Sequence, residues 1–573
     1  MTKEDNSSQG ANPPKHRALV LQGGGTLGAY EAGVLEVLCK KLTEDDRESN
    51  RQDRLLFDIV AGTSIGAMNA AVLVSQFLQT HNWEKAAEKL RKFWTDQLSV
   101  KCLDISEVSK PWYDQWIKRN PSAASEEAAR RYYSVRKLLL GQVRNNMYYP
   151  CPGLPMEDNR FFDHQFQEKG PNFLHNDWFL HSSRPLQQSI ENYAKFPIST
   201  TFEDKNNNKH PQEPRLLVFS VDVAEGVIVT FDSYPKADGS RKSEYGKYTP
   251  GKGYANVISY DRGIRIEHIM ASGTLPIFYY YARVPTVETE QKNDEDKRCV
   301  TYKSEDNNTR YFWDGGLLSN TPLIELLDAH RQYWNGVANK RKIPDLDVYI
   351  VNVHPSKIDI SILPEDQDGI KDRNNDILYG DRTSRYAEKM AHSITDYARF
   401  VTQMRDLVDE AISEVNDKNK KRELDGKLDA ILSTKTISKN SKDEARKYED
   451  LIIDEFNLNI VLRIERTNYI NSISAKTGDL TLETISKLIQ EGKCDAWFSV
   501  IQKEVNDMEL THSNRRTLTE KLDEAMQNLR RNDYEDNNSE TYRMLSEFIR
   551  EAEKVHGSAR LVRSTEALMA ILD

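Results

Sequence analysis

A serine between small residues is the first candidate for chemistry in this sequence of 573 residues. Residues 62–66 read Gly-Thr-Ser-Ile-Gly, between an apolar run and the segment 67–74, which has helical character. G-x-S-x-G between a strand and a helix is the layout of a nucleophile elbow, in which Gly62 and Gly66 permit a sharp turn and Ser64 stands at the end of a sheet. Ser64 is therefore a candidate covalent nucleophile. Close packing of a strand against a helix selects the same small residues, so the pentapeptide alone leaves both interpretations open.

Four glycines could supply a second requirement of ester cleavage, a set of hydrogen-bond donors for the oxyanion. They follow the apolar run 17–21 and open a segment with helical periodicity, and they are Gly23, Gly24, Gly25 and Gly28. The N–H groups at the start of a helix have no intrahelical partner and the helix dipole is positive there, so an anion is favoured. Glycine at such a position lets a substrate oxygen approach the backbone closely.

The same glycines permit a second interpretation. The pattern G-x-G-x-x-G at 23–28, after a strand and before a helix, matches the fingerprint of a dinucleotide-binding fold. That fold needs an acidic residue at the end of the next strand to bind the ribose. The next predicted strand ends in residues 61–64, and its acidic residue, Asp58, lies inside the strand. Nucleotide binding is therefore the weaker alternative.

A general base must take the proton of the serine, and the sequence offers two kinds. A hydrolase with a Ser-His-Asp triad uses a histidine late in the chain, and three are available without a diagnostic context: His268, His330 and His354. Asp314 ends a strand-like run and is followed by Gly315 and Gly316. It therefore lies at the end of a strand, where open α/β sheets bind their ligands. An ordinary Asp-Gly turn has the same sequence, so these residues alone do not decide between the bases.

The elements that must position these residues alternate between strands and helices. Residues 17–21 predict a buried strand, the apolar period from 27 to 42 predicts a helix, and a polar loop over 43–53 leads to the strand before Ser64. This order is typical of an α/β fold with a parallel sheet. Farther along, the sequence predicts a hairpin at 215–231, a polar loop at 233–256, a helix at 264–272, a strand before Asp314, a helix from 322, and strands at 346–353 and 459–464.

Three segments taken together resemble the patatin-like phospholipase family. They are LVLQGGGTLGAYEAGVLEVL at 19–38, GTSIGAMNAAV at 62–72 and WDGGLLSNTPL at 313–323. The resemblance implies a three-layer α/β/α sheet and a hydrolase that uses a Ser-Asp dyad without a histidine, a metal or a cofactor. It implies that Ser64 is the nucleophile, that Asp314 is the base, and that the four glycines of residues 23–28 form the oxyanion hole. The glycines that support the two loops are then Gly62, Gly66, Gly315 and Gly316.

One residue departs from the family pattern. Many relatives carry Arg or Lys before the last glycine of the oxyanion hole, where this chain has Leu27. A charged donor is therefore missing from the expected site while the backbone donors remain, which bears on head-group preference more than on the reaction. Leu317 and Leu318, next to Asp314, suit an acyl channel and equally suit core packing.

Composition, together with the resemblance, which spans 16–355 and resumes at 459–497, predicts five parts along the chain. We expect a disordered tail at 1–15, a patatin-like core at 16–355, a charged linker and helical insert at 356–458, the last strand and helix of the core at 459–497, and an added C-terminal helical region at 498–573. Within the insert, residues 356–380 predict an Asp-rich linker without regular structure.

The overall charge limits the classes of function. A net charge of −10 and a pI near 5.8 argue against nucleic-acid binding, which needs a basic face. Five cysteines without metal-ligand spacing, a polar N-terminal segment and the lack of a long apolar run predict a cytoplasmic protein that touches membranes only at their surface. The expected activity is cleavage of fatty-acyl esters of phospholipids or lysophospholipids at a membrane or micelle surface. A non-catalytic interaction module is the alternative from another class, and the oligomeric state is left open.

Overall fold

The computed structural model describes the larger part of the chain. The described residues are 15–51, 54–99, 149–150, 181–202, 212–276, 281–287, 309–337, 343–358, 363, 367–381, 383–439, 445–453, 456–467, 480–531 and 539–572. The predicted tail lies outside these residues except for Lys15.

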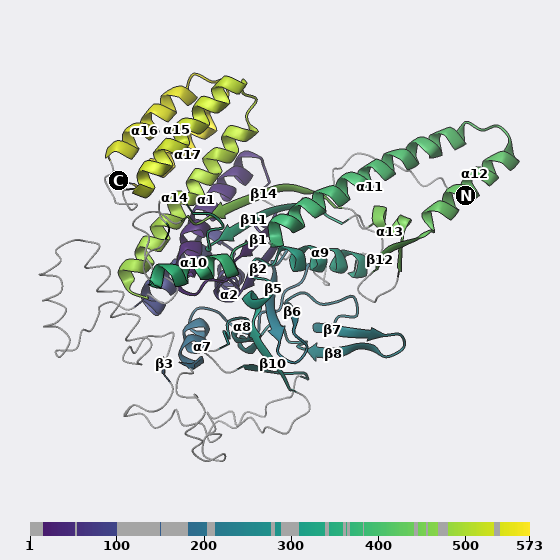
Figure 1. The fold of residues 1–573 in the computed structure, drawn as a ribbon, viewed down its shortest axis with the longest axis horizontal. Helices are drawn as coiled ribbons and strands as arrows, with labels where there is room; N and C mark the ends of the chain where they lie inside the picture. The colour runs from purple at the N-terminus through teal and green to yellow at the C-terminus, as the bar shows by residue number, and fades with distance from the viewer. Residues whose placement is uncertain are drawn as a thin grey trace, which may run out of the picture.

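The centre of the molecule is one mixed β-sheet in the order β14-β11-β1-β2-β5-β10-β9, with β6 paired to β5 (Figure 1). Five neighbouring strands are parallel: β14 (Leu458–Glu465), β11 (Leu346–Asn352), β1 (His16–Leu21), β2 (Ile59–Thr63) and β5 (Arg215–Asp222). The antiparallel strands are β6 (Val227–Asp232), β10 (Thr309–Asp314) and β9 (Ala282–Pro285). The predicted parallel start of the sheet and the predicted hairpin of β5 and β6 are confirmed.

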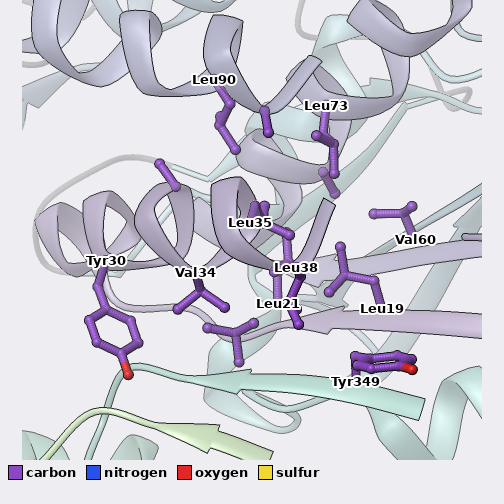
Figure 2. Close-up of a cluster of buried hydrophobic side chains, with 14 of the residues drawn as sticks. Leu19, Leu21, Tyr30, Val34, Leu35, Leu38, Val60, Leu73, Leu90 and Tyr349 are labelled. Carbon is purple, nitrogen blue, oxygen red and sulfur yellow. The ribbon is translucent and has the colours of Figure 1, made fainter. Parts of the chain in front are cut away.

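Helices cover both faces of this sheet, and the side chains of β1 show how. Leu19 and Leu21 belong to an apolar cluster with α1 (Gly28–Glu48) and α2 (Ile65–Thr80), and Figure 2 shows Leu35 and Leu38 of α1 pointing toward them. The alternate residues, Ala18 and Val20, belong to a second cluster that contains α9 (Leu323–Val337). A strand buried on both faces in this way gives a three-layer α/β/α fold, as predicted.

The C-terminal helices extend the first of these clusters. They are α14 (Leu482–Asp507), α15 (His512–Arg531), α16 (Ser539–Ala552) and α17 (Ala559–Met569), drawn in yellow-green to yellow in Figure 1. Helix α14 crosses α1 at two glycines: a Cβ on Gly33 would lie 2.0 Å from the carbonyl oxygen of Ile489, and a Cβ on Gly492 would lie 2.2 Å from that of Tyr30. Because α14 runs unbroken past residue 497, the predicted last helix of the core and the predicted C-terminal region share one element.

Three segments predicted as irregular contain regular structure. Helix α1 continues to Glu48 through the predicted loop at 43–53, because polar residues there are paired: Lys41 with Asp45 at 3.1 Å and Arg17 with Asp46 at 2.6 Å. The predicted loop at 233–256 contains most of an exposed hairpin of β7 (Lys242–Thr249) and β8 (Gly253–Ser259), whose polar side chains conceal the strand pattern.

The predicted linker at 356–380 contains α10 (Gln367–Tyr379). Its aspartates Asp372 and Asp376 are buried, so the inward face of α10 is acidic. The sequence therefore lacks the apolar periodicity that would have predicted this helix. The rest of the insert contains α11 (Thr383–Ser413), α12 (Lys418–Leu432), the short strands β12 (Lys435–Lys439) and β13 (Ala445–Lys447), and α13 (Tyr448–Ile453). Smaller elements beside the sheet are α3 (Trp83–Lys92), a π-helical turn (Phe93–Leu98), α7 (Arg184–Glu191) and α8 (Ile266–Ser272).

Candidate active site

Ser64 occupies a sharp turn between β2 and α2. Its backbone has φ 56° and ψ −126°, in the region that residues with a side chain rarely adopt. The flanking glycines allow this turn, because a Cβ on Gly62 would lie 2.3 Å from the carbonyl oxygen of Gly66, and one on Gly66 would lie 2.4 Å from that of Leu21. Such strain persists only where the surrounding structure enforces it, and it concentrates at functional sites.

A second serine fixes this turn from the outside. The N–H of Ser64 donates to Oγ of Ser272 at 2.9 Å, and that hydroxyl donates in turn to the carbonyl oxygen of Phe219 at 2.6 Å. Ser272 is the last residue of α8 and is fully buried. The sequence analysis did not identify it, because nothing local distinguishes a serine at the end of a short helix.

Asp314 is a buried carboxyl at the end of β10. Oδ1 accepts the N–H of Gly316 at 2.7 Å, whereas Oδ2 is buried and has no hydrogen-bond partner among the described residues. Burial raises the pKa of Asp314 to about 7, while the hydroxyl of Ser64 and the N–H of Gly316 lower it by smaller amounts. The serine hydroxyl is thus close enough to the carboxyl to affect its pKa. A carboxyl with this pKa and an unpaired oxygen can accept a proton at neutral pH.

The loop after Asp314 packs directly on the strand that carries the serine. The hydroxyl of Thr63 donates to the carbonyl oxygen of Ser319 at 3.1 Å. Gly315 is tightly enclosed, since a Cβ there would lie 2.4 Å from the carbonyl oxygen of Phe219 and 3.0 Å from Cγ2 of Thr63. The two loops are therefore held side by side by backbone contacts.

The glycine loop also reaches this site, but its four N–H groups are not equivalent. The N–H of Gly23 donates to the carbonyl oxygen of Asn320 at 3.3 Å, and that of Gly28 donates within the short turn Gly25–Leu27. In the described part of the chain, the N–H groups of Gly24 and Gly25 make no hydrogen bond. These two are the open donors of the predicted oxyanion hole. The loop lies close to the nucleophile candidate, because a Cβ on Gly23 would lie 2.9 Å from Cβ of Ser64.

Asn320 connects the glycine loop to the aspartate loop, and the sequence analysis did not identify it. Its Nδ2 donates to the carbonyl oxygens of Gly23 at 3.0 Å and of Tyr379 at 2.7 Å. Its Oδ1 would lie 2.7 Å from a Cβ on Gly316, so it touches the aspartate loop as well. Gln22 makes a similar link, since its Nε2 donates to Thr321 at 2.8 Å. These amides fix the spacing between the open N–H donors and the carboxyl.

The three candidate histidines are all buried, in different places. His268 accepts the N–H of Arg265, and burial lowers its pKa to about 3. His330 pairs through Nε2 with the carbonyl oxygen of Pro344 at 2.8 Å, and burial lowers its pKa well below the ordinary value. His354 pairs through Nδ1 with Asp376 at 3.1 Å, and its Nε2 would lie 3.4 Å from a Cβ on Gly24. Of these three, His354 is thus the one that contacts the glycine loop.

Two further observations bear on cofactors and membranes. Asp58 directly precedes β2 and does not lie inside the strand as predicted, and its carboxylate accepts the backbone N–H of Arg17 at 2.7 Å. No group of three or more His, Cys, Asp or Glu side chains in the described ranges could hold a metal ion. Among the helices that the structure describes, none is long and apolar enough to cross a membrane.

Comparison with known proteins adds one decisive match. A family model described as patatin-like phospholipase matches residues 19–327, more than half of the chain, and contains all three motifs. The crystal structure of VipD from Legionella pneumophila is 12% identical and aligns over 98% of this chain and 85% of its own, with a TM-score of 0.25. The ExoU–SpcU complex from the type III secretion system of Pseudomonas aeruginosa is 11% identical over 98% of this chain and 90% of that one, with a TM-score of 0.18. No curated protein matches the chain. On the family match, the chain belongs to the patatin-like phospholipase family.

Proposed function

We propose that this lipid acyl hydrolase cleaves fatty-acyl esters of phospholipids or lysophospholipids through an acyl-enzyme on Ser64. The observation that carries the proposal is the state of Asp314, a buried carboxyl with a pKa of about 7 and an unpaired Oδ2 beside a serine in a strained turn. A nucleophile needs an adjacent base to become reactive, and Asp314 is the candidate for that role.

In the proposed first step, Oγ of Ser64 attacks the ester carbonyl while Oδ2 of Asp314 takes the hydroxyl proton. The negative charge that forms on the carbonyl oxygen accepts hydrogen bonds from the open N–H groups of Gly24 and Gly25. Collapse of this intermediate breaks the bond to the alcohol, which receives the proton from Asp314 and leaves. The fatty acyl group then remains on Ser64 as an ester.

In the second step, Asp314 takes a proton from water, and the resulting hydroxide equivalent attacks the acyl ester. The same N–H groups stabilise the second oxyanion, and the proton returns to Ser64 as the fatty acid leaves. Every proton thus passes through one carboxyl, which is why a pKa near neutrality suits the reaction. Leu27 contributes no charge at the oxyanion loop, so the stabilisation in this proposal is by backbone donors.

Replacement of the nucleophile tests the proposal. We expect Ser64→Ala to abolish hydrolysis of a short-chain ester and of phosphatidylcholine, with a fold as stable as that of the parent in thermal unfolding. The matched control is Ser433→Ala, because Ser433 is exposed at the end of α12. Retained hydrolysis in Ser64→Ala would show that another residue is the nucleophile.

Because His354 contacts the glycine loop, the rival histidine-dependent mechanism can be tested at this one residue. In a histidine-dependent hydrolase, His354→Gln would abolish activity as completely as Ser64→Ala. We instead expect this variant to lose stability, because it removes the pairing of His354 with the buried Asp376, while kcat stays within about tenfold of the parent. The non-catalytic alternative predicts no ester hydrolysis at all, and the nucleotide alternative predicts a rise in Tm with dinucleotides.

A further inference from the structure

An ordinary surface helix turns its apolar side to the core and its charged side to water. In helix α11 this arrangement is reversed. The side of α11 that faces the body is held mainly by polar and small residues. Glu388 accepts a hydrogen bond from Arg463 of β14 at 2.7 Å, Thr395 donates to the carbonyl oxygen of Phe456 at 3.2 Å, and Ala387 is buried.

The outward side of the same helix is apolar and exposed. Six of its large side chains have exposed fractions between 44% and 66%, and they are Met390, Ile394, Tyr397, Phe400, Met404 and Leu407. At 100° per residue these positions fall within an arc of roughly 140°, on the side opposite to Thr395. Figure 1 shows α11 running out from the sheet toward α12. We refer to these six residues as the apolar face of α11.

Helix α10 connects α11 to the candidate active site along the chain. Tyr379, the last residue of α10, accepts hydrogen bonds through its carbonyl oxygen from Asn320 at 2.7 Å and Gln22 at 3.1 Å, and burial and the Asp314 carboxyl both raise the pKa of its phenol. The preceding residue, Leu378, is 61% exposed. Leu318, two residues before Asn320, is also more than half exposed. Exposed apolar side chains therefore flank the site, and α11 begins four residues after Tyr379.

We propose that the apolar face of α11, together with Leu318 and Leu378, is the surface that docks on the phospholipid membrane supplying the substrate. The proposal rests on the proposed function, since a lipid hydrolase must bring its site to a lipid surface. A helix with one apolar face and aromatic residues on it lies in the membrane interface with that face buried. Docking by α11 would place the exposed leucines beside the site against the same surface.

Two observations favour a membrane over a second copy of the chain. A coiled-coil seam between two helices uses a narrow stripe, whereas an arc of roughly 140° suits a flat and continuous apolar surface. The helix carries four basic and five acidic residues, so its charge is nearly balanced. Docking should consequently depend on apolar burial, with little preference for anionic lipid and little effect of salt.

The test measures vesicle binding separately from hydrolysis. Binding is measured by co-sedimentation of the full-length Ser64→Ala protein with phosphatidylcholine vesicles, with and without phosphatidylserine, at low and high salt. We expect the added substitutions Tyr397→Gln, Phe400→Gln and Leu407→Gln to reduce partitioning at least tenfold. The matched control substitutes three exposed apolar residues elsewhere, Val257→Gln, Val287→Gln and Ile324→Gln, and should bind as the parent does.

Each possible result decides the proposal. Undiminished vesicle binding by the α11 variant, or no binding by the parent, would overturn it. Binding that requires phosphatidylserine and disappears at high salt would overturn it too. A parent that light scattering shows to be a dimer, which the α11 substitutions dissociate while no vesicles are bound, would assign the face to a second copy.

A separate assay distinguishes failure of the docking surface from failure of the proposed function. With Ser64 intact, the α11 variant should hydrolyse a water-soluble short-chain ester at the parent rate and lose activity on vesicles. If the parent hydrolyses no ester but the co-sedimentation results are as expected, the docking surface stands and the proposed chemistry fails.

Discussion

The sheet that carries the candidate dyad and the insert helix α11 differ in how strongly the surrounding structure constrains them. Every residue of β2 and β5 is buried, and the turn at Ser64 is fixed from several sides by Ser272, Gly62 and Gly66. In α11, by contrast, the buried residues are Ser384, Ala387, Ala398 and Ile412, out of 31 in the helix. The candidate dyad thus lies where many contacts fix the backbone. The exposed apolar surface lies where few contacts do so.

This difference indicates which destabilising features each region can contain. A strained backbone and a buried carboxyl both cost stability, and they persist only in surroundings that are packed on all sides. An exposed apolar helix costs less within the fold but leaves a surface that needs a partner. The following predictions test this contrast, from the largest expected effect to the smallest.

The largest effect should follow replacement of the proposed base, Asp314. Asp314→Asn cannot accept the proton of Ser64, so we expect kcat/KM for a short-chain ester to fall about 10³-fold or more. The variant should also be more stable than the parent above pH 7. The wild-type carboxyl has its pKa raised from 3.8 to about 7 by burial, so folding opposes its ionisation increasingly as pH rises from about 4 to about 7.

Thermal unfolding of Asp314→Asn and the parent at several pH values checks the second expectation. The difference in stability should lose its pH dependence below about pH 3, where the carboxyl is protonated in both the folded and unfolded states. Equal stability at pH 8 would mean that Asp314 is not destabilised by burial.

The next effect compares one substitution in the two regions. Leu19 is fully buried in β1, and Leu407 is 58% exposed in α11. We expect Leu19→Ala to lower the free energy of unfolding by about 2–5 kcal/mol, because it leaves a cavity in the core. Leu407→Ala should change it by less than about 0.5 kcal/mol. Denaturant unfolding of both variants measures these values, and a large cost at Leu407 would show that α11 packs against something.

Loss of the link between the two loops should have a smaller effect on catalysis. Asn320→Ala removes the donor to Gly23 and Tyr379, so the open N–H groups lose their fixed distance from the carboxyl. We expect kcat to fall by about 10- to 100-fold with KM little changed, because misplacement of oxyanion donors acts mainly on the transition state. A rise in KM alone would show that Asn320 serves substrate binding instead.

The smallest effect should come from a buried carboxyl beneath the glycine loop. Glu31 accepts Nδ2 of Asn69 at 2.8 Å, its Oε1 has no partner among the described residues, and burial raises its pKa well above the ordinary value. Burial thus favours the neutral form of this carboxyl, which Gln resembles in shape and charge, so Glu31→Gln should leave activity unchanged. The parent should lose stability relative to this variant as pH rises above about 4.5, which pH-dependent unfolding would show. A variant that is less stable than the parent at pH 8 would contradict this.

The sequence predicted those parts of the fold and site whose causes are local. Strands buried on both faces are continuous apolar runs, and a tight strand-to-helix turn needs Gly62 and Gly66 next to Ser64, so both leave a readable pattern. The parallel start of the sheet follows from such patterns, whereas the three-layer arrangement was implied by the resemblance to the patatin-like family. The segments read wrongly, at 43–53, 233–256 and 356–380, contain regular structure in which polar residues are paired, exposed or buried.

The supporting residues of the site could not be predicted, because they act across long separations. Ser272 meets Ser64 across 208 residues, and Asn320 meets Gly23 across 297. The raised pKa of Asp314 also depends on burial that only the assembled sheet creates. A single sequence contains no local signal for such contacts.

Covalent labelling of the nucleophile tests the central claim most directly. The full-length protein is treated with a fluorophosphonate at a series of pH values, and the adduct is located by mass spectrometry of peptides. The account predicts a single adduct on Ser64, absent from Ser64→Ala, whose rate of formation rises with pH through an apparent pKa of about 7 in the parent and loses this dependence in Asp314→Asn. An adduct on another residue, or a labelling rate on Ser64 that Asp314→Asn does not alter, would contradict the Ser64–Asp314 dyad.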